Sequence, residues 1–359
     1  MIIMTNAQKQ SMPNFTAIDL FCGCGAVTQG LKGIFEVIVA VDNNPYASES
    51  YRVNHPEVHF FEEDITQLDI SKILQVVGNQ SIDLMVVCAP CQPFSSQNHT
   101  KNTDERVNLI LQACRFAKVL KPRLIFFENV KGISASKHSS ITQKLKIDLK
   151  KLGYNHWLGP LSVDAADYGV PQRRKKWIMM VSCEKKALPT LPNPTSPEGK
   201  RIKVEDAIGD LPPLSSGEIS DNDPLHFARK HKPIALRRFA HIKKDGGSRF
   251  DLPPNLVLDC HKGHKGHPDV YGRMTWNAVA STLTTGCTDV TRGRFLHPRD
   301  DRAITLREAA RLQTFPDYYQ YDGCPQEIAR QIGNAVPVEF VRTIGHAIAE
   351  SLTESNRRS

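Results

Sequence analysis

The chain of 359 residues has no long hydrophobic run, either near its start or elsewhere. No stretch approaches the roughly 20 apolar residues that a membrane-spanning helix needs, so the sequence predicts no membrane association. The polar segment Met1–Asn14 lacks the apolar core of a signal peptide. Without a secretion signal, we expect a cytoplasmic protein whose nine cysteines are reduced thiols.

The sequence also lacks internal repeats of solenoid length. Hydrophobic content of 40% and charged content of 23% are ordinary for a globular protein, and the length suits one large domain with a smaller one. The net charge of +8 fits a polyanionic partner. Basic residues gather in the middle third of the chain, at 172–176, 229–232, 237–238, 243–244 and 261–267. This pattern favours a DNA-facing cleft, with a solvated basic surface as the alternative.

Short apolar runs alternate with segments that have a helical pattern. The predicted strands cover residues 16–20, 37–41, 58–61, 82–87, 124–127 and 177–181. Helices are predicted from Val27, from Pro45, and over 108–120 and 303–312, with a loop and a closing helix over 328–352. Such alternation indicates a doubly wound α/β sheet. Four prolines between Leu188 and Gly199 then predict a linker, after which a small second domain begins.

Two strand ends carry side chains suited to chemistry. The segment Ala89–Ser95 follows the apolar run Leu84–Val87 and contains Cys91, and Glu128 follows another such run. Ligands of open α/β sheets bind at the carboxyl ends of the strands. A thiol nucleophile and a carboxyl group that can exchange a proton are therefore expected to face one pocket.

The turn after the first strand, Phe21–Ala26, is rich in glycine and small residues. Glycine allows close approach of a ligand to the backbone, and the following helix offers its N–H groups. The dinucleotide spacing G-x-G-x-x-G is absent, because the next glycine after Gly25 is Gly30. Asp42 ends the second strand and is placed to accept hydrogen bonds from ribose hydroxyls, with helix capping as the alternative role.

These segments, in their order, resemble the motif set of the DNA (cytosine-5) methyltransferases over residues 17–338. The matching motifs are Asp-Leu-Phe-x-Gly-x-Gly from Asp19, Pro-Cys-Gln-Pro-Phe-Ser from Pro90 and Glu-Asn-Val from Glu128. The resemblance implies a seven-stranded, mostly parallel, Rossmann-like sheet with a smaller target-recognition domain. The expected divisions are a catalytic domain at 1–195 plus 328–359, a recognition domain at 196–302 and a hinge at 303–327.

The resemblance also implies S-adenosyl-L-methionine as cofactor, S-adenosyl-L-homocysteine as product, and no metal. Cys91 would attack C6 of a flipped cytosine, Glu128 would hold the base at N3, and Asn129 would hold the loop. Arg174 matches a base-contacting arginine, whereas Lys176 stands where the family has a second arginine. The implied cofactor-binding residues are Phe21, Gly23, Gly25, Asp42, Asp64, Ile65, Pro90, Asn334 and Val336. The implied DNA-binding residues are Ser95, Gln172, Arg273 and Thr282.

Alternatives remain at this point. A transfer-RNA cytosine methyltransferase shares the motif set, a silent DNA-binding regulator would lack turnover, and a nicotinamide oxidoreductase would use the glycine loop differently. A thiolate metal site (Cys22, Cys24, Cys88, Cys91) and a histidine cluster (His261, His264, His267) match standard ligand spacings poorly. We expect double-stranded DNA as the partner of a monomer, with a cognate restriction endonuclease as a candidate genetic partner. The sequence does not indicate the target site.

Overall fold

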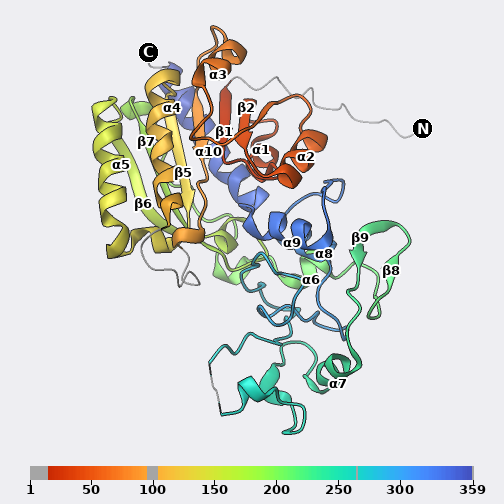
Figure 1. Cartoon of the computed structure of the whole chain (residues 1–359). Helices are drawn as coiled ribbons and strands as arrows, with labels where there is room; N and C mark the ends of the chain where they lie inside the picture. Colours follow the sequence, from red (N-terminus) through yellow and green to blue (C-terminus); the bar gives the residue numbers. More distant parts are fainter. Residues whose placement is uncertain (1–14, 95–103, 264–265, 358–359) are drawn as a thin grey trace, which may run out of the picture.

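The computed structural model describes residues 15–94, 104–263 and 266–357 (Figure 1). Its central element is a seven-stranded sheet. The strands are β1 (Thr16–Leu20), β2 (Glu36–Asp42), β3 (His59–Glu62), β4 (Leu84–Val87), β5 (Leu124–Asn129), β6 (His156–Asp164) and β7 (Lys175–Ser182). The helices around the sheet are α1 (Ala26–Leu31), α2 (Pro45–Asn54), α3 (Ile70–Val77), α4 (Gln112–Leu120), α5 (Ser139–Lys151) and α10 (Val338–Arg357).

The strands lie in the order β3-β2-β1-β4-β5-β7-β6. Five neighbouring strands from β3 to β5 pair in parallel, and β7 runs antiparallel to both β5 and β6. The predicted mostly parallel, seven-stranded sheet is therefore confirmed. After β3 the chain returns to the middle of the sheet and adds β4 beside β1. Sheets of this type bind their ligands at such a switch point, here between β1 and β4.

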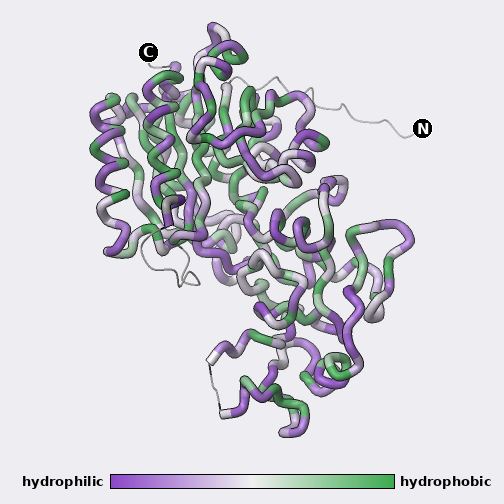
Figure 2. The backbone as a smooth tube through the Cα atoms, viewed as in Figure 1, coloured by the Kyte–Doolittle hydropathy of each residue, from purple (hydrophilic) through white to green (hydrophobic). Residues whose placement is uncertain are grey.

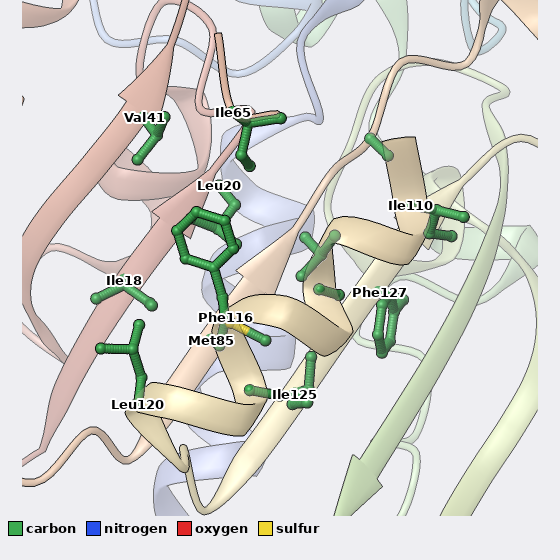
Figure 3. Close-up of a cluster of buried hydrophobic side chains, with 14 of the residues drawn as sticks. Ile18, Leu20, Val41, Ile65, Met85, Ile110, Phe116, Leu120, Ile125 and Phe127 are labelled. Atoms are coloured by element: carbon green, nitrogen blue, oxygen red, sulfur yellow. The ribbon is translucent and has the colours of Figure 1, made fainter. Parts of the chain in front are cut away.

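Consecutive strand residues point to opposite faces of the sheet. Both faces carry apolar side chains, and helices cover both. Phe127 packs on one face with Leu20 and with Phe116 of α4 (Figure 3). Phe126, its neighbour, packs on the other face with Phe340 of α10. Figure 2 shows the hydrophobic residues concentrated along the strands between these layers. No helix in the described part of the chain is long and apolar enough to cross a membrane.

The prediction missed some elements. Strand β6 escaped because Gly159-Pro160 interrupts its pattern, and its pairing with β7 shifts register between Leu158 and Leu161. Helices α3 and α5 were also not predicted. The loop and closing helix predicted over 328–352 correspond to the second half of helix α9 (Pro325–Asn334), a short link and helix α10. The helical conformation of 328–334 was therefore not predicted.

The remaining elements lie beyond the carboxyl edge of the sheet (Figure 1). They are α6 (Val204–Ile208), β8 (Ile219–Ser220), β9 (Asp223–Phe227), α7 (Pro233–His241) and α8 (Leu306–Leu312). Phe239 and Leu296 belong to a hydrophobic cluster within this region. A second cluster joins the region to Cys24 and Ala26 of the first turn. The division into a recognition domain at 196–302 and a hinge at 303–327 stays a prediction.

Candidate active site

A cavity of about 880 Å³ lies at the carboxyl ends of the central strands. Three predicted catalytic residues, Cys91, Glu128 and Lys176, line it. Most of the predicted cofactor-binding residues line the same cavity, namely Phe21, Gly23, Asp42, Asp64, Ile65, Pro90, Asn334 and Val336. Segments that lie up to 315 residues apart, from Phe21 to Val336, thus meet in one hollow.

The carboxylate of Asp42 fixes the first turn of the cavity wall. Its Oδ2 accepts a hydrogen bond from the N–H of Gly23 at 2.8 Å, and its Oδ1 accepts from the N–H of Asn44 at 2.9 Å. Burial raises the pKa of Asp42, and these backbone donors oppose the rise. The capping alternative is wrong for this residue, because Asn44 is the N-cap of α2.

Gly25 has a different position from Gly23. It does not line the cavity, and its φ of +92° places it in the left-handed region. A Cβ there would lie 2.7 Å from the His55 ring and 2.8 Å from the Tyr319 hydroxyl. That hydroxyl donates a hydrogen bond to the carbonyl of Cys24 at 2.5 Å. The contacts of Gly25 are therefore with the packing behind the turn, and its role in cofactor binding stays a prediction.

The loop that carries Cys91 is tied to the end of β5. The Nδ2 of Asn129 donates to the carbonyl of Ala89 at 3.1 Å, and its Oδ1 accepts from the N–H of Val130 at 2.9 Å. Asn129 is buried and does not line the cavity. The N–H of Phe94 donates to the carbonyl of Cys91 at 3.0 Å, which begins a short 3₁₀ turn. Ser95, predicted to bind DNA, lies outside the described residues.

Glu128 and Lys176 form an ion pair inside the cavity wall. The Nζ of Lys176 lies 2.5 Å from Oε1 of Glu128, and the two residues are 3% and 5% exposed respectively. The pair exists because β7 is antiparallel, so its first residues lie at the edge where β5 ends. Oε1 of Glu128 therefore faces the ammonium group of Lys176, and the pair is shielded from solvent.

Arg174 lies behind the cavity wall and holds three segments together. Its guanidinium donates to the carbonyls of Leu283 at 2.7 Å and Gly333 at 2.8 Å. Burial lowers the pKa of Arg174, and the charge of nearby Glu128 opposes this. The predicted contact between Arg174 and the base stays a prediction.

The predicted DNA-binding residues differ in exposure. Gln172 is fully buried; its Oε1 accepts a hydrogen bond from the N–H of Leu283 at 2.8 Å, and its Nε2 donates to Oε1 of Gln313 at 3.0 Å. Arg273 is also fully buried, and its guanidinium donates to several backbone carbonyls, including that of His297 at 2.7 Å. These contacts give both residues structural positions. Of the three that the structure describes, Thr282 alone is exposed.

Sequence reasoning missed part of the cavity wall. Polar side chains of 106–112 and of helix α9 complete it: Arg106, Asn108, Gln112, Glu327, Arg330 and Gln331. In α9 they recur with Asn334 at intervals of three or four residues, the spacing of one helix face. That polar stripe was the available signal. Within the described ranges, no group of three or more His, Cys, Asp or Glu side chains could hold a metal ion.

Comparison with known proteins agrees with this geometry. Residues 15–350 match the sequence model of the C-5 cytosine-specific DNA methylases. The chain belongs to this family. It is 36% identical over 349 residues to the Type II methylase M.HgiDII of Herpetosiphon aurantiacus, covering 95% of this chain and 97% of that protein. It is 31% identical to the Type II methyltransferase M.XorII of Xanthomonas oryzae pv. oryzae, covering 93% and 84%.

Solved structures share the fold. A prophage-encoded protein of E. coli superimposes with a TM-score of 0.76 at 24% identity, covering 95% of this chain and all of that one. The DNMT2 of Spodoptera frugiperda gives a TM-score of 0.61 at 17% identity, covering 93% and 99%. With its family established, the protein is a DNA (cytosine-5-)-methyltransferase, and this family uses S-adenosyl-L-methionine as methyl donor. The transfer-RNA alternative has less support.

Proposed function

We propose that Cys91 is the nucleophile of this methyltransferase, that Glu128 acts on the base and that Lys176 holds Glu128. The observation that carries the proposal is that all three side chains line one cavity together with eight predicted cofactor-binding residues. A cytosine stacked in a duplex cannot enter such a hollow, so the target base must be flipped out of the DNA.

The cavity fits the cofactor. Asp42 and Asp64 supply carboxylate acceptors for hydroxyl and amine groups, and the ring of Phe21 offers an apolar surface for a purine. A Cβ built on Gly23 meets no heavy atom within 4 Å, so the backbone there is open to a ligand. When bound, S-adenosyl-L-methionine supplies a methyl group activated by its sulfonium.

The protein side chains then act on the cytosine in sequence. The sulfur of Cys91, as thiolate, forms a bond to C6, and the electron pair of the C5–C6 double bond moves towards C5. The carboxyl group of Glu128 shares a proton with N3 and so stabilises the charge that develops on the ring. Lys176 holds that carboxyl group. After C5 is methylated, loss of the C5 proton restores the double bond and breaks the bond to Cys91.

The region at 196–302 is proposed to read the DNA sequence, with 303–327 as hinge. Basic residues at 229–232 and 237–238 supply phosphate contacts, and the net charge of +8 favours a double-stranded DNA partner. Exposed Thr282 remains the best-placed predicted DNA contact of the described part. A monomeric enzyme in the cytoplasm, with a cognate restriction endonuclease, completes the proposal.

The test is transfer of labelled methyl groups to unmethylated genomic DNA, followed by bisulfite sequencing. Methylation of C5 at one short motif would support the proposal and reveal the target. Incorporation into transfer RNA but not into DNA would overturn it. Cys91→Ser is the active-site variant, and Cys114→Ser in α4, outside the cavity, is the matched control.

A further inference from the structure

A second thiol lies beside the proposed catalytic carboxyl group. Val86 of β4 pairs with Phe126 of β5, and both side chains pack on the α10 face of the sheet. Cys88 follows Val86 by two residues, and Glu128 follows Phe126 by two. Cys88 and Glu128 therefore point to the same face as that pair and lie side by side. Both line the cavity.

The ion pair continues this row across the next strand. Glu128 pairs with Ile178 of β7, which also packs on the α10 face. Lys176 precedes Ile178 by two residues and shares its face. Glu128 thus lies in the middle of the row, with Lys176 on one side at 2.5 Å and Cys88 on the other.

The thiol of Cys88 is suited to donate a hydrogen bond. Burial raises its pKa well above the ordinary value, and the adjacent Glu128 carboxylate and buried Asp19 raise it further, while Lys176 opposes the rise. The pairing of β4 with β5 places the thiol beside the Glu128 carboxylate, which is the acceptor within its reach. Cys88 therefore keeps its proton near neutral pH, and an S–H group is a donor.

We propose that Cys88 is a positioning residue that holds Glu128 from the side opposite Lys176. Two partners on opposite sides fix the carboxyl group in the orientation needed at N3 of the base, which one cation alone would leave free to rotate. The inference rests on the proposed role of Glu128. The two cysteines of Cys88-x-x-Cys91 then have different functions: Cys88 stays protonated and donates a hydrogen bond, whereas Cys91 reacts with the base.

The test compares Cys88→Ala, Cys88→Ser and the control Cys114→Ala, whose thiol lies in α4 outside the cavity. Cys88→Ala is expected to lower kcat by about tenfold, as for one lost hydrogen bond to a charged group, with KM for DNA and cofactor within about twofold. Cys88→Ser should retain most of the activity because its hydroxyl also donates. Wild-type kcat in Cys88→Ala would overturn the inference, as would equal losses in the alanine and serine variants.

A double-mutant cycle separates positioning from general packing. In a Glu128→Ala background, Cys88→Ala should cause no further loss of kcat, whereas multiplying losses would overturn the inference. If Cys88→Ala fails to fold, the serine variant alone still decides between retained and lost turnover. Cys91→Ser is measured in parallel: turnover by that variant would contradict the proposed function itself, whereas an inactive Cys91→Ser beside a fully active Cys88→Ala contradicts only the inference.

Discussion

Substitution of alanine for the two glycines of the first turn, Gly23 and Gly25, should have different effects. In Gly25→Ala the new methyl group would lie 2.7 Å from the His55 ring and 2.8 Å from the Tyr319 hydroxyl. Both partners are 1% exposed, so neither can move aside into solvent. Overpacking costs about 1–3 kcal/mol and a left-handed alanine about 1–2 kcal/mol. We therefore expect the free energy of unfolding to fall by about 2–5 kcal/mol.

Gly23→Ala should behave differently. Its φ of +54° carries the same backbone cost of about 1–2 kcal/mol, but no heavy atom lies within 4 Å of the new methyl group. Because Gly23 lines the cavity, the methyl group occupies space proposed for the cofactor. We expect S-adenosyl-L-methionine to bind about tenfold more weakly, the equivalent of about 1.4 kcal/mol of overpacking.

Urea unfolding without cofactor measures the first effect, and titration calorimetry measures the second. Gly25→Ala should have the lower unfolding midpoint of the two variants. Gly23→Ala should lose more cofactor affinity relative to the stability that it loses. The reasoning is refuted if Gly25→Ala unfolds like the wild type, or if Gly23→Ala is the less stable variant.

Further predictions concern single side chains. Cys91→Ser should abolish methyl transfer and leave cofactor affinity, measured by calorimetry, within a few-fold of the wild type; near-normal turnover would contradict the mechanism. Lys176→Met should destabilise the fold by about 3–5 kcal/mol, because it leaves a buried carboxylate without its cation, whereas Lys176→Arg should keep more stability and activity. Arg273→Met should cost about 3 kcal/mol or more in urea unfolding, because several buried carbonyls lose their donor; an unchanged midpoint would argue that the residue serves DNA binding alone. Burial lowers the pKa of His55 and His297 to about 4 from 6.5. At these two sites the unfolded chain therefore binds more protons between pH 6.5 and 4, so their contribution to the free energy of unfolding should fall as pH falls through that window, by up to about 1.4 kcal/mol per pH unit for each histidine. Buried Asp19, whose pKa is raised to about 8, opposes one of the two; a flat profile would contradict the prediction.

The buried parallel strands could be predicted from the sequence alone. Buried parallel strands such as Leu84–Val87 form unbroken apolar runs, and the residues after them carry the proposed chemistry. Cys91 and Glu128 were found in this way, Lys176 was found through its place in the family's motif, and the structure brings the three together. Strand β6 was missed because an edge strand that is partly exposed and broken by Gly159-Pro160 has no such run.

Burial of polar side chains was not predictable from the sequence. Gln172 and Arg273 lie in motif positions that suggest DNA contacts, yet both are fully buried among backbone carbonyls and amides. A buried arginine and an exposed one look alike in a sequence, since the partners that decide the difference come from distant segments. Cys88 is a similar case, because its neighbour Glu128 becomes apparent only when β4 and β5 are paired in register.

The reversed direction of β7 also sets how firmly the active-site cation is held. Lys176 is the second residue of a strand that pairs with both β5 and β6; its own partner is Val163 of β6, and the pairing with β5 begins one residue later, at Trp177. Slow amide hydrogen exchange is expected for this strand, on the timescale of global opening rather than of local fraying. The charge that holds Glu128 is thus anchored on the central sheet, and we expect it to persist as long as the sheet does.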